Sequence, residues 1–321
     1  MVRDAFTGKA EGTVKSYAYR CRHFIRWLHL HQCSVIFPID DEILAKYLCD
    51  LKSRASSDSV VTSAAAAIKW IHALSNTNRN PVDSPVVQQI ISGAKRSLHK
   101  PPSQKCPLTL SQLHLILDVF AQHDCTTLQL RTACYVALKY ALLFRHNEIA
   151  DLKANHIFAL PDNQGLRIFI PKSKTDVFRD GDFGYIADTQ DSYSPVKILK
   201  KFLDRLGISI GEDKFVFTPL TFCAKTKNYK PTRDKPLSYT RCRELFLEAL
   251  RSIGVEDVTN YGLHSLRSGG ATHLTNQGVS EELILQHGRW KTTTAKNRYI
   301  QRDAPQRLSV AKAVMMEFNN Y

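Results

Sequence analysis

Hydrophobic residues recur at helical spacing through the first part of the chain. Within residues 12–31 the apolar positions lie three or four apart, and Arg20 and Arg22 stand among them. The same period predicts further helices at about 41–53, 58–76 and 84–99. The alternation of apolar and polar positions that marks a half-buried strand does not occur before residue 100. We therefore expect residues 1–100 to form a small helical domain.

The pattern is interrupted and then changes period in the rest of the chain. The prolines of "HKPPSQKCPLTL" predict a linker at 101–110. Short alternating segments at about 155–188 predict a small three-stranded antiparallel sheet, and 224–236 reads as a basic loop. Helices are predicted from residue 111, then at about 127–144, 194–206, 237–253, 263–277, 280–287 and 304–318, with a short strand at 214–218. The fold class is thus expected to be mainly α, and the second domain, 111–321, mixed but mostly helical with a C-terminal helix.

Composition narrows the classes of protein to which this chain can belong. It has 321 residues, enough for two domains, and 43% of them are hydrophobic, as in soluble globular proteins. No apolar run approaches the ~18 residues that span a membrane, and the N-terminus lacks the apolar core of a secretory signal. The eight cysteines include no C-x-x-C pair, which argues against a zinc ribbon and a disulfide framework. We expect reduced thiols, no membrane partner, and no metal or other cofactor.

Charge points to a class of partner. The formal net charge is +14. Residues 1–100 carry 14 Lys and Arg against 8 Asp and Glu, and residues 101–321 carry 30 against 22. Both parts are therefore basic, as expected of a protein that grips a polyanion with two lobes.

Two motifs in the middle of the chain could carry chemistry. Arg145 and Glu148 stand three residues apart just after the long apolar helix, where the common interpretation is a surface ion pair that contributes little. Lys172 and Lys174 lie in the turn between two predicted strands. Loop lysines are usually solvated, yet a flexible ammonium in a hairpin can reach a phosphate or protonate a leaving oxygen.

Two further motifs lie near the C-terminal end. His264 and Arg267 share one face at the start of a helix that begins after Gly262, where the helix N-terminus already favours anions. A capped helix with a solvent-facing arginine would give the same pattern. Trp290 lies in "HGRWKTTTAKNRYI", and Tyr299 follows nine residues later. Each aromatic residue taken alone is more often a packing anchor.

Together these motifs resemble the catalytic set of the tyrosine recombinase (phage integrase) family. That set is an Arg with an acidic residue three positions later, a hairpin Lys, H-x-x-R, a His or Trp, and a Tyr nine residues further on. The matching positions here are Arg145, Glu148, Lys174, His264, Arg267, Trp290 and Tyr299. The resemblance covers roughly residues 108–302 and implies a helical core-binding domain before the catalytic domain.

The chain departs from the family's pattern at three points. The family often has Thr-Gly-Leu before the first Arg, where this chain has Leu143 and Phe144. His287 lies three residues before the His/Trp position, so we expect it to be structural. Lys172 competes with Lys174 for the hairpin position, and the resemblance favours Lys174.

The resemblance implies a reaction through a covalent intermediate. Tyr299 would be the nucleophile, forming a 3′-phosphotyrosine and freeing a 5′-hydroxyl. Lys174 would protonate the departing 5′-oxygen. Because the phosphotyrosine conserves the bond energy, religation would need no ATP. The sequence shows no acidic cluster placed for two metal ions and no His/Cys ligand set, so we expect no metal ion in the reaction either.

The remaining members of the set would act on the phosphate. Arg145 and Arg267 would offer bidentate forks to its non-bridging oxygens. His264 would orient the phosphate or accept the tyrosine proton, and the indole N–H of Trp290 would donate to it. Glu148 would hold Arg145 or His264 in place.

The same resemblance implies the partners and the setting. We expect double-stranded DNA as the substrate, self-association to a tetramer on two DNA sites, and DNA contacts from Arg20, Arg22, Lys172, Arg289 and Lys291. The "GRWKT…RYI" context is most similar to recombinases of eukaryotic mobile elements of the DIRS, Ngaro and Crypton type, which act in integration or excision. The location would be the nucleus in a eukaryote, and otherwise the cytoplasm or nucleoid. Two alternatives are a type IB topoisomerase-like enzyme and a catalytically idle DNA-binding protein.

Overall fold

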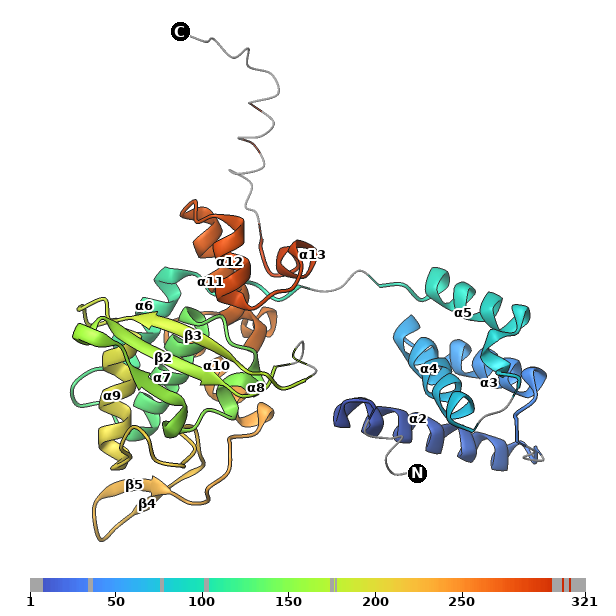
Figure 1. Cartoon of the computed structure of the whole chain (residues 1–321), viewed down its shortest axis with the longest axis horizontal. Helices are drawn as coiled ribbons and strands as arrows, with labels where there is room; N and C mark the ends of the chain where they lie inside the picture. The colour runs from blue at the N-terminus through green and yellow to red at the C-terminus, as the bar shows by residue number, and fades with distance from the viewer. Residues whose placement is uncertain are drawn as a thin grey trace. The chain divides into compact units, whose positions relative to one another are not determined.

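The structure is a computed structural model that describes residues 8–33, 37–75, 78–100, 104–173, 176, 178–301, 308 and 312 (Figure 1). The chain divides into two compact units, Met1–Ser103 and Gln104–Tyr321. Both units are mostly helical, and the second also contains a small antiparallel sheet, so the predicted fold class is confirmed.

Two of the helices in the described part of the first unit have clear start signals. Asp40 accepts a hydrogen bond from the backbone N–H of Glu42 at 2.7 Å, and Pro85 stands in the first turn of its helix, where a missing N–H costs nothing. Phe24, Tyr47 and Leu48 belong to the single core that the helices bury. The helices are α2 (Glu11–Leu30), α3 (Asp41–Arg54), α4 (Asp58–Leu74) and α5 (Pro85–Ser97), with a short 3-10 turn at Pro81–Asp83.

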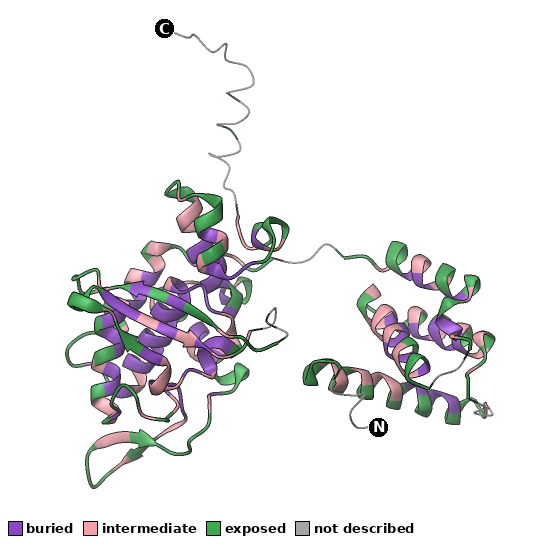
Figure 2. Cartoon of the chain, viewed as in Figure 1, coloured by how far each residue is buried: buried purple, intermediate pink, exposed green. Residues whose placement is uncertain are grey.

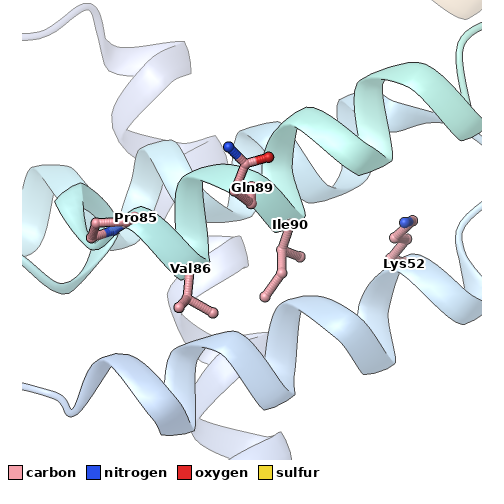
Figure 3. Close-up of a pocket in the computed structure, with 5 residues that line it drawn as sticks. All are labelled: Lys52, Pro85, Val86, Gln89 and Ile90. Atoms are coloured by element: carbon pink, nitrogen blue, oxygen red, sulfur yellow. The ribbon is translucent and has the colours of Figure 1, made fainter.

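The surface of this unit offers two different kinds of face. On α2, Arg22 is exposed and Arg20 is half-buried, with its guanidinium carbon 5.6 Å from the centroid of the Tyr19 ring. A shallow groove between α3 and α5 is instead largely apolar, and Val86 and Ile90 lie in it (Figure 3). The predicted DNA contacts of this unit therefore lie on a helix that does not line the groove.

The sheet of the second unit has the predicted three antiparallel strands. They are β1 (Ile157–Ala159), β2 (Gly165–Ile170) and β3 (Asp182–Ala187), in the order β1-β2-β3. In β2, Leu166, Ile168 and Ile170 are buried, while Arg167 and Phe169 between them are only half-buried. This alternation places one face of the sheet against the core.

Helix α7 (Thr127–Ala141) is the centre of the second unit. Twelve of its residues are buried, and it contacts α6, α9, α10 and α11 (Figure 2). Its C-terminal end is therefore a fixed point on which a site can be built. The other helices are α6 (Leu110–Phe120), α8 (His146–Ala150), α9 (Pro195–Leu206), α10 (Tyr239–Ser252), α11 (Leu263–Asn276), α12 (Glu281–Gly288) and α13 (Thr293–Asn297).

The structure differs from the sequence-based expectation in the predicted linker. Its second half, residues 104–109, packs on the second unit. The backbone N–H of Cys106 donates to the carbonyl of Asn260 at 2.8 Å, and that of Leu108 donates to the carbonyl of Ser265 at 2.9 Å. Leu108 is also fully buried. Leu108 thus anchors this half of the predicted linker to the second unit.

Two short segments also differ. The strand predicted at 214–218 is reduced to one bridge between Lys153 and Phe215, because its apolar side chains are buried without a pairing strand. The basic loop predicted at 224–236 contributes to a hairpin, β4 (Leu220–Cys223) with β5 (Asn228–Pro231). Phe222 and Tyr229 stabilise it by packing across the strands, with ring centroids 5.3 Å apart.

Two remaining expectations are the C-terminal helix and the absence of a membrane-spanning segment. Of the helix predicted at 304–318, only Leu308 and Lys312 are among the described residues. Within the described ranges, no helix is long and apolar enough to cross a membrane.

Candidate active site

The turn between α7 and α8 presents Arg145. Helix α7 ends at Ala141, and Leu143 then takes a left-handed backbone with φ of 52° before Arg145 forms the N-cap of α8. Such a backbone costs a residue other than glycine about 1–2 kcal/mol. Leu143 occupies the position of the glycine in the Thr-Gly-Leu pattern described above. It is fully buried in a small apolar cluster with Trp290, and this packing offsets the strain.

Four consecutive carbonyls of this turn, those of residues 141–144, each accept a hydrogen bond from a side chain. A helix leaves its last carbonyls without partners inside the helix, so buried ones need other donors. The donors, in carbonyl order, are His287 Nε2 at 2.7 Å, Arg289 Nη2 at 3.0 Å, Arg267 Nη1, and Lys139 Nζ at 2.6 Å. We call these four side chains and four carbonyls the carbonyl clamp. The donors of the clamp come from α7, from α11 and from the end of α12, and together they hold the turn in place.

Glu148 is a buried carboxylate that links three arginines. It accepts hydrogen bonds from the backbone N–H of Arg145 at 2.8 Å, from the Arg145 guanidinium at 2.7 Å and from Arg289 at 3.3 Å. Arg267 Nη1 lies 3.9 Å away. Burial alone would raise the pKa of Glu148, but the charge of Arg289 and the hydrogen bonds from Arg145 hold that pKa below its ordinary value. Glu148 is therefore ionised at neutral pH and fixes the Arg145 guanidinium, which is 16% exposed.

Positive charge outnumbers negative charge in this buried cluster. Lys139, Arg145, Arg267 and Arg289 surround Glu148. Burial lowers the pKa of Arg267 to about 9, which leaves its guanidinium charged at neutral pH. Buried positive charge without a counter-charge is costly. The cluster is therefore suited to an anionic group.

Tyr299 lies beside three of the residues that the sequence predicted for the site. Its ring centroid is 5.9 Å from that of His264 and 5.4 Å from that of Trp290. The guanidinium carbon of Arg267 lies 5.2 Å from the Tyr299 ring and 4.2 Å from the Trp290 ring. His264 and Arg267 come from α11, while Trp290 and Tyr299 follow α12 and α13. The fold thus brings four predicted site residues together.

Two buried donors beside Tyr299 lack an acceptor. The indole Nε1 of Trp290 and Nε of Arg267 have no hydrogen-bond partner in the part of the chain that the structure describes. An unsatisfied buried donor costs about 1–3 kcal/mol, and native structures keep few of them. An anion bound next to the Tyr299 ring would accept from both.

Gly288 makes room for the Trp290 ring. A Cβ atom on Gly288 would lie 1.8 Å from Trp290 Cζ3, far inside any contact distance. The carbonyl of Gly288 also accepts from Arg267 Nη2 at 2.5 Å. Gly288 therefore positions two site residues at once.

Comparison with known proteins decides the family. A sequence model of the phage integrase family matches residues 107–305, more than half of the 321 residues. The chain belongs to the phage integrase family. Over 91% of its length it is 26% identical to an integrase/recombinase xerD homolog of Selenomonas ruminantium, covering 82% of that protein. It is 23% identical to the recombinase cre of Escherichia phage P1, over 93% of this chain and 85% of cre. A lambda integrase tetramer bound to a Holliday junction shares the fold, with a TM-score of 0.58 and 15% identity over 98% of this chain and 75% of that one.

These relatives establish the class of activity. Phage integrase family members are the tyrosine recombinases, and the protein is accordingly a site-specific DNA recombinase, an enzyme that cuts and rejoins DNA strands.

The structure of this phage integrase family member describes two of its three predicted lysines, Lys172 and Lys291. Lys174 lies outside the described residues. Its competitor Lys172 has a side chain that is 61% exposed, and it pairs with Asp151 at 3.0 Å, directly after α8. Lys291 is exposed, as a contact to DNA requires.

Arg289 differs from its expected surface position, and Arg267 makes contacts that the sequence did not predict. Arg289, expected at the DNA surface, is 8% exposed and donates to Glu148 and to the carbonyls of Leu142 and His287. The carbonyl acceptor after the end of α7 holds the Arg289 side chain inside the fold. Both terminal nitrogens of Arg267 donate to backbone carbonyls, and Nε has no partner among the described residues. Its expected role toward phosphate stays a prediction.

Sequence reasoning missed Lys139. It is 1% exposed and donates to the carbonyl of Phe144. Its signal in the sequence is its setting, a single lysine in "ACYVALKYALLF", where no face of the helix is polar enough to expose it. A lysine is almost never fully buried without a partner, so this position demanded one.

Proposed function

We propose that this recombinase cleaves DNA by attack of the Tyr299 hydroxyl oxygen on a phosphodiester. The oxygen–phosphorus bond that forms links Tyr299 to the 3′-phosphate, and the bond that breaks releases a 5′-hydroxyl. The carrying observation is the pair of buried donors without acceptors, on Trp290 and Arg267, beside the Tyr299 ring. A phosphate placed for attack by Tyr299 would supply the missing acceptors and the missing negative charge.

The surrounding residues take complementary roles in this proposal. Arg145 and the Nε–H of Arg267 neutralise charge on the non-bridging oxygens, and the Trp290 indole donates to one of them. His264, whose ring lies next to that of Tyr299, accepts the phenolic proton. Lys174 gives the departing 5′-oxygen its proton.

A trapping experiment tests the proposal. DNA that the protein binds would be selected from a random pool and nicked, so that the released strand diffuses away and the covalent adduct accumulates. Tyr299→Phe should bind this DNA normally and give no adduct, because only the nucleophilic oxygen is removed. Tyr261→Phe is the matched control, since the Tyr261 hydroxyl is engaged with Gln112 at 3.0 Å. An adduct of undiminished yield from Tyr299→Phe would refute the assignment.

We further propose the biological setting in which this reaction takes place. The "GRWKT…RYI" sequence around Trp290 and Tyr299 supports a recombinase of a DIRS-, Ngaro- or Crypton-type mobile element, acting in the nucleus in integration or excision. The basic charge of residues 1–100 supports a role of the first unit as the core-binding domain that holds the DNA. The lambda integrase tetramer supports assembly as a tetramer on two DNA sites. Light scattering with and without paired sites would test the assembly.

A further inference from the structure

Lys139 has no part in the reaction described so far. It lies on α7 with its Nζ donating to the carbonyl of Phe144 at 2.6 Å, and its own carbonyl accepts from the backbone N–H of Phe144 at 3.2 Å. The ammonium has no direct carboxylate partner in the described structure, although burying a cation is costly. Methionine would fill similar space without that cost. Packing alone therefore does not account for a lysine here.

The contact falls on the peptide group that leads into Arg145. This group consists of the Phe144 carbonyl and the Arg145 N–H. Lys139 holds the carbonyl at 2.6 Å, and Glu148 holds the N–H at 2.8 Å. A cation at the oxygen end and an anion at the hydrogen end both align with the peptide dipole, and hydrogen bonds to charged groups are the strong ones. Two buried side chains of opposite charge thus fix one peptide plane.

We propose that Lys139 is a positioning residue for Arg145: together with Glu148 it fixes the Phe144–Arg145 peptide plane and so aims the Arg145 guanidinium at the scissile phosphate. This inference rests on the proposed function above. Lys139 is buried, so it acts on the reaction through the groups that it holds, and its hydrogen bond falls on the peptide group of Arg145.

The surroundings of Lys139 make this positioning sensitive to pH. Burial and then the charge of Arg267 lower the pKa of Lys139 to about 7. A neutral amine is a weaker donor than an ammonium, so the hold on the carbonyl weakens as pH rises through 7. The charged and titratable groups that act on Lys139, from α11, α8, α10 and the turn, are Arg267, Glu148, His146, Cys242 and Arg145.

Single-turnover cleavage by the full chain tests the inference, with Arg131→Met as a matched control. Arg131 lies on the same helix, is buried, and donates to one carbonyl, that of Thr218, at 3.0 Å. Lys139→Met should slow cleavage about 10²-fold, the usual effect of a catalytic group displaced by about 1 Å, with unchanged DNA affinity. Arg131→Met should lower the midpoint of thermal unfolding as much as Lys139→Met does, but it should leave the cleavage rate unchanged. Equal rates for the two variants would overturn the inference.

A double-mutant cycle separates positioning from a general structural role. In an Arg145→Lys background, Lys139→Met should cause little further loss, because the group that it positions is gone. A fall in cleavage rate by the same factor in both backgrounds would overturn the inference. The fall in wild-type rate above pH 7 should also be absent in Lys139→Met. If Lys139→Met does not fold, Lys139→Gln, a neutral donor one atom shorter, goes through the same cycle.

The outcomes also distinguish this inference from the proposed function. If the wild type forms no covalent adduct on selected DNA, the proposed function fails. If the wild type forms the adduct and the cycle is additive, only the role of Lys139 fails.

Discussion

Replacing Glu148 by glutamine should destabilise the second unit by about 3–5 kcal/mol at pH 7, the usual cost of breaking a buried ion pair. Glutamine keeps the shape but removes the charge. Glu148 accepts two hydrogen bonds from guanidinium groups, from Arg145 at 2.7 Å and Arg289 at 3.3 Å. Hydrogen bonds to charged groups make a net contribution of about 1.5–3 kcal/mol each, so the two together give about 3–6 kcal/mol, which overlaps this range.

The effect should depend on pH, and the pKa of Glu148 fixes the sign. The folded-state pKa lies below the ordinary value, which is about 4.3 in the unfolded chain. The carboxylate therefore contributes its full stabilisation above the unfolded pKa and loses it as pH falls through the folded pKa. The difference between the wild type and Glu148→Gln should be largest at neutral pH and shrink below about pH 4.

Urea unfolding followed by tryptophan fluorescence would measure this difference. Trp290 lies in the second unit and is 7% exposed, whereas Trp27 and Trp70 lie in the first unit. In a background with Trp27→Phe and Trp70→Phe, emission reports on the second unit alone. The midpoint and slope of that transition give the free energy of unfolding.

A second carboxylate provides the control and the refuting result. Glu244 pairs with Arg241 at 3.1 Å, and both side chains are about half exposed, so Glu244→Gln should cost less than about 1 kcal/mol. If Glu148→Gln costs no more than this control at pH 7, Glu148 does not hold the arginines together. A difference that grows as pH falls would refute the reasoning equally.

Three further predictions follow from individual positions. Leu143→Gly should be more stable than Leu143→Ala by about 1 kcal/mol in thermal unfolding, because only glycine accepts φ of 52° without strain; the reverse order would contradict this. Gly288→Ala should displace the Trp290 ring, shift its emission to longer wavelength and abolish cleavage while sparing DNA binding; unchanged emission would refute it. Lys174→Ala should slow cleavage of ordinary DNA by about 10²–10⁴-fold and recover on a substrate with sulfur at the 5′-bridging position, since a thiolate leaves without a proton. If Lys172→Ala shows that rescue instead, the two lysines exchange roles.

Most of the secondary structure could be predicted because it depends on near neighbours in the sequence. The 3.6-residue period located α2–α5 and α9–α12, and alternation located β1–β3. The end of α7 could not be predicted in this way. The apolar period continues to Phe144, but the helix ends at Ala141, because Leu143 turns left-handed and distant side chains take the carbonyls.

The candidate site also combines features that the sequence could predict with features that depend on distant contacts. The proximity of His264, Arg267, Trp290 and Tyr299 could be predicted from the resemblance to the family's spaced motifs, and the structure brings the four residues together. Their catalytic roles stay predictions. The contacts of Arg289 could not be predicted, because most of its acceptors are backbone carbonyls, which every residue type provides and which leave no signature in the sequence. Position in the fold, more than residue type, decides what such a side chain binds.

The carbonyl clamp also determines how late in synthesis the turn that carries Arg145 can be fixed. Its donors Arg267, His287 and Arg289 lie 124, 146 and 147 residues after the carbonyls that they bind. A growing chain therefore makes the turn that carries Arg145 long before the side chains that hold it have left the ribosome. Contacts of such long range form late, so the site closes only when nearly all of the second unit is available. A chain that ends before Arg267 already carries much of the basic charge that binds DNA, but it lacks both the donors that fix the Arg145 turn and Tyr299.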